Sequence, residues 1–190
     1  MRPLHLLALL LAAAAAGAAP PPALLLQSAD GVPLCVAESG NPAGPAIVFV
    51  HGFAQTHAAF SRQFVPALEA EFRLLALDLR GHGCSGKPWE PAAYLEPRRW
   101  AGDLAALLAQ RRVQRPVLAG WSAGGYWIMD YLREHGTEGI AGVVLAGSHG
   151  GLMPADLDPG LAQRAAAMRA ANAEYPLDMA AALRRADEFV

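Results

Sequence analysis

The segment VLAGWSAGGYW, residues 117–127, places a serine between glycines directly after a short apolar run. The apolar run is typical of a buried strand, and the residues that follow it have the apolar spacing of a helix. A GxSxG turn between a strand and a helix forces the serine into a strained backbone conformation, so Gly120 and Gly124 must be small. The turn directs the hydroxyl of Ser122 into a cleft at the carboxyl end of a sheet, and Ser122 is therefore our candidate nucleophile.

The residue after Ser122 supplies a second part of the same chemistry. The Ala123 amide stands at the start of the expected helix, where it can donate to a developing oxyanion with the help of the helix dipole. A glycine-flanked serine also occurs by chance in many turns, so the motif alone is weak. The strand before it and the helix after it are the context that the motif requires.

The rest of the chain alternates between strand and helix patterns. We expect strands over residues 23–28, 33–39, 46–50, 73–79, 116–121 and 139–147, the first two joined as a hairpin around Asp30-Gly31. We expect helices over residues 57–70, from Glu96-Pro97 onward, and over 122–136. Strands that read as continuous apolar runs and alternate with helices indicate an α/β fold, a mainly parallel sheet with helices on both faces.

The apolar faces of two of these helices can be read directly. Phe60, Phe64 and Leu68 lie at four-residue spacing in the expected helix 57–70. In the helix after Glu96-Pro97, the residues expected on the buried face are Trp100, Leu104, Leu107 and Leu108.

The first residues, MRPLHLLALLLAAAAAGAAPPP, have a basic start, an apolar stretch and then small residues. We expect residues 1–18 to be a signal peptide, cleaved after Ala18, and the protein to be exported to the periplasm or secreted. An uncleaved anchor or a start codon assigned too far upstream, which would leave the protein cytoplasmic, stays open. No stable membrane span is expected after cleavage, because the apolar stretch is short for a membrane helix.

Charge and composition exclude some partners. The chain has 190 residues, with 15 basic and 17 acidic residues and a formal net charge of −2. No basic stripe interleaved with aromatic residues occurs, so we expect no nucleic-acid partner. The length suits one domain, and the oligomeric state stays open.

Two cysteines, Cys35 and Cys84, lie outside the leader. Their spacing matches no metal motif, and we expect no metal site. An exported protein could oxidise them to a disulfide, but the sequence does not say whether they meet. Isolated cysteines are usually small buried apolar residues, and that is our expectation for both.

Three segments in a fixed order resemble the α/β-hydrolase fold family: FVHGF (49–53), DLRGHGCSGKP (78–88) and GWSAGG (120–125). The resemblance covers roughly residues 30–150 and is nearest to the branch of esterases, lipases and cofactor-free haloperoxidases. It implies an oxyanion hole made by the amides of Phe53 and Ala123, a small ester or related acyl substrate, and no cofactor. Epoxide hydrolases and dehalogenases of the family typically have aspartate where Ser122 stands.

Other residues of these motifs are expected to be structural. The resemblance implies that His51 fixes the oxyanion loop, and that Asp78 and His82 shape the loop after the fourth strand. We expect His57, His135 and His149 to be surface residues at a helix start, a helix end and a loop. Phe60, Trp121 and Trp127 are candidates for an acyl pocket, although aromatic residues flanking such a core are packing residues by default.

A serine nucleophile needs a histidine base, and the base needs an acid. The resemblance places both on loops after the seventh and eighth strands, which we do not find in this sequence. We therefore expect residues 23–151 to be the N-terminal part of a hydrolase core, truncated after the sixth strand, and residues 152–190 to begin a helical lid. Asp156 is a weak candidate for the acid, and no histidine follows His149.

Two hypotheses follow. The chain is part of a serine hydrolase, inactive on its own for lack of the base, or it is a short non-catalytic binding protein that retains a partial hydrolase fold. The DNA sequence after codon 190 would distinguish them, since an open frame with an aspartate and then a histidine supports the first.

Overall fold

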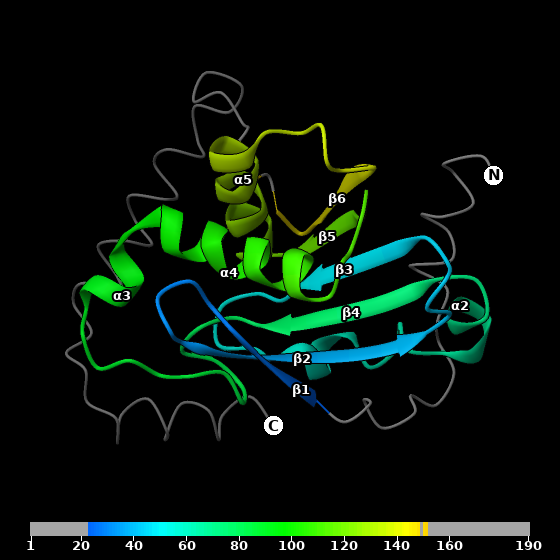
Figure 1. The fold of residues 1–190 in the computed structure, drawn as a ribbon, viewed down its shortest axis with the longest axis horizontal. Coiled ribbons are helices and arrows are strands. Elements are labelled where there is room, and N and C mark those ends of the chain that lie inside the picture. The colour runs from blue at the N-terminus through cyan, green and yellow to red at the C-terminus, as the bar shows by residue number, and fades with distance from the viewer. Residues whose placement is uncertain (1–22, 149, 152–190) are drawn as a thin grey trace. The chain divides into compact units, whose positions relative to one another are not determined.

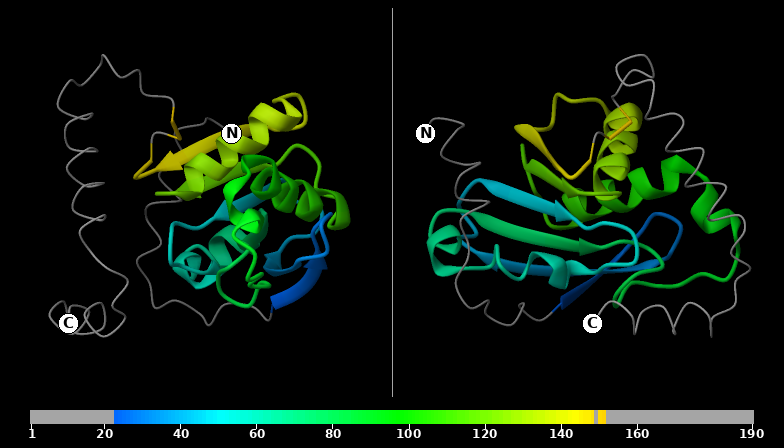
Figure 2. Two further views of the ribbon diagram at one scale, coloured as in Figure 1. Left: turned by 90° about the vertical axis from the view of Figure 1, so that its left-hand side faces the viewer. Right: turned by 180° about the vertical axis from the view of Figure 1, so that it is seen from behind.

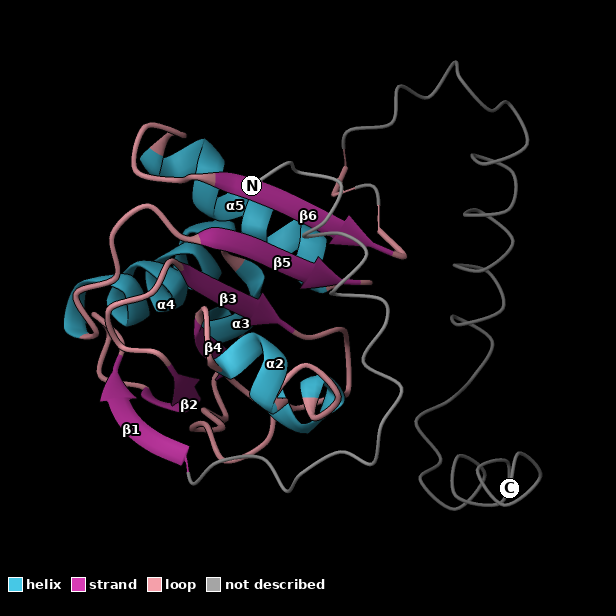
Figure 3. Cartoon of the chain, turned by 90° about the vertical axis from the view of Figure 1, so that its right-hand side faces the viewer, coloured by secondary structure: helices cyan, strands magenta, loops and turns pink. Residues whose placement is uncertain are grey.

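The computed structural model describes residues 23–148 and 150–151 of the chain. They contain one six-stranded sheet, formed by β1 (Ala23–Gln27), β2 (Pro33–Gly40), β3 (Ala46–Val50), β4 (Arg73–Asp78), β5 (Val117–Trp121) and β6 (Gly142–Ala146). The strand order is β1-β2-β4-β3-β5-β6 (Figure 1). The four strands β4, β3, β5 and β6 are parallel to one another, as the aligned arrows of β3, β5 and β6 show in Figure 3. Strand β2 is antiparallel to both of its neighbours, β1 and β4. The predicted mainly parallel α/β fold is confirmed.

The helical segments are η1 (His57–Phe60), α2 (Pro66–Glu69), α3 (Ala92–Leu95), α4 (Pro97–Gln110) and α5 (Gly124–His135). Helices α4 and α5 pack against each other (Figures 1 and 2) and contact one face of the sheet through Val48, Val50, Leu75 and Leu77. The other face, with Ile47, Phe49, Leu74 and Ala76, packs against the segment that carries η1 and α2. Alternate side chains of β3 and β4 thus enter two cores, which explains their continuous apolar runs.

The expectation of one continuous helix over residues 57–70 is wrong. The structure has a 3-10 turn, η1, and a short helix, α2, separated by non-helical backbone. Val65 precedes Pro66 and is extended, with φ −129° and ψ 149°, because the proline ring disfavours helical backbone in the residue before it. The apolar spacing still identified buried side chains, since Phe64 and Leu68 are both buried. The short helix α3 was not expected.

Arg80, directly after β4, is fully buried and joins three parts of the fold. Its guanidinium donates two hydrogen bonds to Asp103 on α4, at 2.7 and 2.6 Å, and two to Asp30 in the β1–β2 hairpin, at 2.9 and 3.1 Å. It also donates to the Ala93 carbonyl and the Ser28 hydroxyl. Hydrogen bonds from Arg80 hold the pKa of the Asp30 carboxyl well below its usual value. We call Arg80, Asp30 and Asp103 the arginine network.

The expectation that Cys35 and Cys84 are separate buried thiols is wrong, because the structure joins them in a disulfide. Cys35 pairs with Asp78 in the β2–β4 register, and the chain after β4 returns to place Cys84 beside that carboxyl group. The bond ties β2 to the loop after β4. Disulfides are typical of oxidising compartments, which supports our proposal that the protein is exported.

Loss of this disulfide should destabilise the protein. It closes a segment with a sequence separation of 49, and cross-links of this size contribute about 2–4 kcal/mol. We expect reduction to lower the free energy of unfolding by about this amount, measured by urea denaturation with and without dithiothreitol. The double variant Cys35→Ala/Cys84→Ala is the control, because its stability should not respond to reductant. Free thiols that titrate in the untreated native protein would contradict the pairing.

No helix within residues 23–148 and 150–151 is both long and apolar enough to cross a membrane.

Candidate active site

Ser122 lies at the sharp turn between β5 and α5. Its φ is +52°, a left-handed conformation that residues with a side chain rarely adopt. The turn is held on both sides, since the Ser122 amide donates to the Ala146 carbonyl at 2.9 Å and the Gly125 amide donates to the Ser122 carbonyl at 3.1 Å. The strained serine backbone predicted from GxSxG is confirmed.

The two flanking glycines are required by close backbone contacts. A Cβ atom on Gly124 would lie 2.1 Å from the Val50 carbonyl oxygen, and one on Gly120 would lie 2.7 Å from the Gly125 nitrogen. Both contacts are far inside van der Waals distance and involve backbone that cannot move independently. The small residues expected at both positions are therefore explained by the approach of α5 to the ends of β3 and β5.

Substitution of Gly124 tests this approach. Gly124→Ala should push α5 away from β3 and lower the free energy of unfolding by about 1–3 kcal/mol, the usual cost of overpacking. Gly102→Ala is a matched control, because Gly102 lies within α4 and a Cβ there meets no atom within 4 Å. Alanine is a better helix former than glycine, so the free energy of unfolding of the control should rise by about 0.5–1 kcal/mol. Urea denaturation of both variants measures the difference, and equal stabilities would contradict the close approach.

Two backbone amides near Ser122 are open. Neither the Phe53 N–H, in the loop after β3, nor the Ala123 N–H, at the start of α5, has an acceptor among the described residues. Helix α5 has 12 residues, so its N-terminus carries a partial positive charge next to the Ala123 amide. A Cβ atom on Gly52 would lie 3.1 Å from the Ser122 Cβ, which places the loop after β3 directly beside the serine.

His51 fixes the peptide group that carries the Phe53 amide. The His51 ring is fully buried, with Nδ1 2.7 Å from the Gly52 carbonyl oxygen and Nε2 accepting from the Leu79 amide at 3.1 Å. These partners assign the proton to Nδ1. Burial lowers the pKa of His51, which keeps the ring neutral. Because a peptide group is planar, holding the Gly52 carbonyl also sets the direction of the Phe53 N–H.

The other histidines differ in their surroundings. His57 was expected at the surface, which is wrong: its side chain is 16% exposed and its Nδ1 lies 3.0 Å from Oδ1 of the buried Asp78. Asp78 also accepts the backbone amides of His57 and Cys84, so this carboxylate organises both loops. His82 lies in the loop after β4, with its ring near those of His51 and Phe53.

Asp78 and the disulfide sulfurs also bring three potential metal-ligand atoms within 4.8 Å of one another. The two sulfur atoms of Cys35 and Cys84 are bonded to each other. They therefore offer no thiolate to a metal ion.

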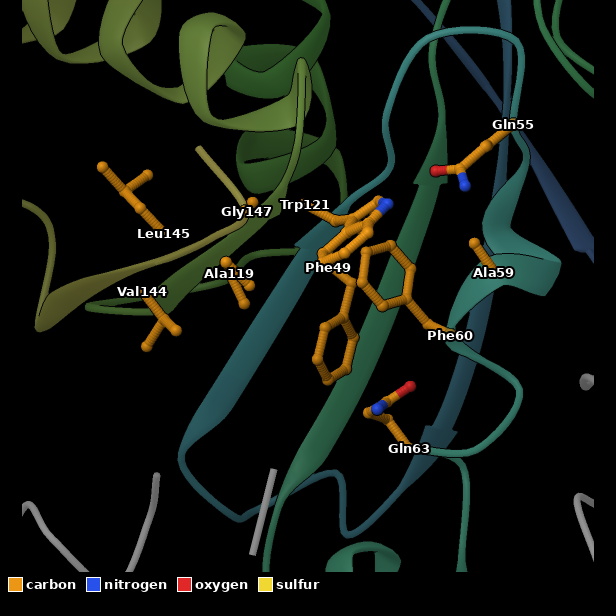
Figure 4. Close-up of a pocket in the computed structure, with 12 residues that line it drawn as sticks. Phe49, Gln55, Ala59, Phe60, Gln63, Ala119, Trp121, Val144, Leu145 and Gly147 are labelled. Carbon is orange, nitrogen blue, oxygen red and sulfur yellow. The ribbon is translucent and has the colours of Figure 1, made fainter. Parts of the chain in front are cut away.

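A cavity of about 720 Å³ runs from the carboxyl ends of β3, β5 and β6 along the sheet face below η1 (Figure 4). Its lining consists of Phe49, Gln55, Ala59, Phe60, Gln63, Ala119, Gly120, Trp121, Val144, Leu145, Ala146 and Gly147. Of the three aromatic residues considered for an acyl pocket, Phe60 and Trp121 line this cavity. Trp127 instead stacks on Trp100, with 5.0 Å between the ring centroids. No sequence pattern identifies Gln55 as a residue of the cavity, because its position there depends on how the loop after β3 folds.

Asp156, the weak candidate for the acid, and His149, expected to be a surface residue of a loop, fall outside the described residues. Within residues 23–148 and 150–151, no side chain is hydrogen-bonded to the Ser122 hydroxyl. The described site thus contains an accessible serine, two open amides and an apolar cavity.

Comparisons with known proteins agree with this geometry. The sequence pattern of the alpha/beta hydrolase fold family matches residues 45–186. An epoxide hydrolase from Caballeronia sordidicola is 34% identical over 118 residues, which are 61% of this chain and 35% of that protein. Among solved structures, a protein assigned as an aryl esterase from Burkholderia cenocepacia is 45% identical, with a TM-score of 0.63 over 65% of this chain and 45% of that one. The esterase RhEst1 from Rhodococcus sp. ECU1013 is 43% identical, with a TM-score of 0.61 over 65% and 44%. This chain therefore spans about a third to under half of the length of these proteins.

Proposed function

Since this chain belongs to the alpha/beta hydrolase fold family, we propose that it carries the nucleophile and the oxyanion hole of a serine hydrolase that cleaves small esters. The observation that carries the proposal is the placement of Ser122 at a strained strand-to-helix turn, beside two amides without an acceptor among the described residues. The esterases among the similar structures support the same class of reaction.

The proposed reaction has two halves. Ser122 Oγ forms a bond to the ester carbonyl carbon, its proton passes to a base, and the carbonyl electron pair moves onto oxygen, where the Phe53 and Ala123 amides donate to it. Collapse of this intermediate breaks the bond to the alcohol, which leaves with the proton. Water then attacks the acyl carbon by the same path, which releases the acid and restores Ser122.

The base is the part that the described residues do not supply. We propose that it is a histidine supplied by the product of the complete gene, as the resemblance to the family implies. The similar proteins described above are two to three times as long as the part of them that this chain matches, which supports that proposal. The tests of activity below therefore use the protein expressed from its complete gene.

Hydrolysis of epoxides is a second candidate, because several similar proteins are named epoxide hydrolases. The serine at position 122 argues against it, since members with that activity typically have aspartate at this turn. A non-catalytic binding protein is the third alternative, and it needs no reactive serine.

Labelling by a fluorophosphonate probe tests these alternatives. An activated Ser122 displaces fluoride and becomes phosphonylated, which peptide mass spectrometry would map to the peptide containing residues 120–125. Labelling there together with turnover of p-nitrophenyl acetate supports the esterase. Conversion of styrene oxide to its diol without labelling supports the epoxide hydrolase. Neither reaction by the folded protein supports the binding protein.

A further inference from the structure

The cavity beside Ser122 has an uneven distribution of polar groups. Most of its lining is aliphatic, aromatic or glycine, and no lining residue carries a charge. Its polar side-chain groups belong to Gln55, Gln63 and Trp121. Figure 4 shows Gln63 at the opposite end of the cavity from Gln55, while Trp121 lies between the strand ends and Gln55. Two of the three polar side chains are therefore gathered at the end next to the serine.

The Gln55 carboxamide is fixed in one orientation. Its Oε1 accepts the Gly52 amide at 3.0 Å, and its own backbone amide donates to the Gly52 carbonyl at 3.3 Å. Rotating the carboxamide by half a turn would place its NH₂ group against the Gly52 N–H, two donors facing each other, so the network assigns the orientation. Nε2 then has no acceptor among the described residues, and the residue lines the cavity.

Trp121 provides a second donor at the same place. A Cβ atom on Gly52 would lie 2.9 Å from Gln55 Oε1, 3.3 Å from Trp121 Cδ1 and 3.1 Å from the Ser122 Cβ. The glutamine, the tryptophan and the serine therefore meet around one backbone position. In Figure 4 the indole nitrogen of Trp121 is on the side of the ring nearest to Gln55. No described residue accepts a hydrogen bond from that nitrogen.

Resting on the esterase proposed above, we propose that Gln55 and Trp121 recognise the acyl group of the substrate by donating hydrogen bonds to a neutral oxygen on it. The favoured substrates are esters of oxygenated acids, such as alkoxy or keto acids, rather than of plain fatty acids. A plain acyl chain would cover both N–H groups without an acceptor, which disfavours its binding. A carboxylate is disfavoured as well, because no charged side chain lines the cavity to compensate it.

Two esters of the same shape test the recognition directly. Methyl methoxyacetate differs from methyl butyrate by an ether oxygen in place of one methylene group. We expect the Ser122→Ala protein, which binds without turnover, to bind the methoxyacetate about five- to tenfold more tightly, the effect of about one neutral hydrogen bond. Binding is measured by NMR titration, and the Gln55 side-chain amide signal should shift with the methoxyacetate only.

Variants then assign the preference to the two donors. In the Ser122→Ala background, Gln55→Met should abolish the preference and Trp121→Phe should reduce it, while Gln63→Met, in the same cavity, should leave it intact. Equal binding of the two esters, or a preference that survives Gln55→Met, would overturn the inference. Tighter binding of monomethyl malonate than of the methoxyacetate would overturn the choice of a neutral oxygen. None of these outcomes bears on labelling of Ser122, so failure of the recognition is separable from failure of the esterase.

Discussion

Ester turnover should fall by about 10⁴- to 10⁶-fold in the Ser122→Ala variant of the protein expressed from its complete gene. The alanine keeps the turn but removes the only atom that can form the acyl bond in the proposed reaction. Open amides at Phe53 and Ala123 would still stabilise an oxyanion formed by water, which is why a small residual rate is expected. Turnover of p-nitrophenyl acetate and labelling by the fluorophosphonate probe are the two measurements.

Ser61→Ala is the matched control for this variant. Ser61 directly follows η1, and its side chain makes no hydrogen bond among the described residues. The control should retain full turnover and labelling. The Ser122→Ala variant should also unfold at the same urea concentration as the wild type, because the change removes one oxygen atom without altering the turn. Near-normal turnover in Ser122→Ala would end the assignment of this residue as nucleophile.

The turn around Ser122 could be predicted because its constraints are local. The left-handed backbone of Ser122 and the small residues at positions 120 and 124 follow from the sharp turn between one strand and the next helix. All of these residues lie within the five-residue motif at positions 120–124. Strand positions were predictable for the same reason, since each strand between two helical layers is apolar on both faces. Local sequence patterns were therefore enough to predict the fold class and the position of the candidate nucleophile.

Contacts across the sheet could not be predicted in this way. The disulfide depends on the register that pairs Cys35 with Asp78, and the His57–Asp78 contact depends on how the loop after β3 folds over β4. Gln55 needs the same loop to reach Gly52. Each contact joins segments whose separation in space is set by strand order and register, which no short sequence pattern specifies. The break in the expected helix at Pro66 is different, because proline is a local signal that apolar spacing alone does not contain.

The arginine network is the largest of these long-range features, and breaking it should have the largest effect on stability. Asp103 and Arg80 both have fully buried side chains, so Asp103→Ala leaves a buried guanidinium with half of its carboxylate partners. Removing one partner of a buried ion pair costs about 3–5 kcal/mol, because the remaining charge loses the compensation which that partner supplied. Urea denaturation should show this loss, whereas Arg98→Ala, which removes a solvent-exposed ion pair with Glu96, should leave the midpoint unchanged.

The stability that the arginine network contributes through Asp30 also depends on pH. The pKa of Asp30 is lowered in the folded protein, so its contribution is complete above the ordinary aspartate pKa of about 3.9 and is lost as the pH falls below that value. The wild type should therefore keep the full contribution of Asp30 between pH 5 and 8, a range that lies above that ordinary pKa. The Asp103→Ala variant should be less stable than the wild type across that whole range, since its defect is a buried cation that has lost one of its two carboxylates rather than a protonated acid.

A double variant separates lost charge compensation from lost packing. Arg80→Met/Asp103→Leu replaces the central pair by apolar side chains, and Asp30 keeps its hydrogen bond from Arg99 at 2.9 Å. We expect the double variant to be more stable than Asp103→Ala alone, because it also removes the buried guanidinium that the single variant leaves with one of its two carboxylates. If the double variant is instead as unstable as the sum of its single changes, then the contribution of Arg80 is the shape that it fills between the hairpin and α4, and its charge contributes little.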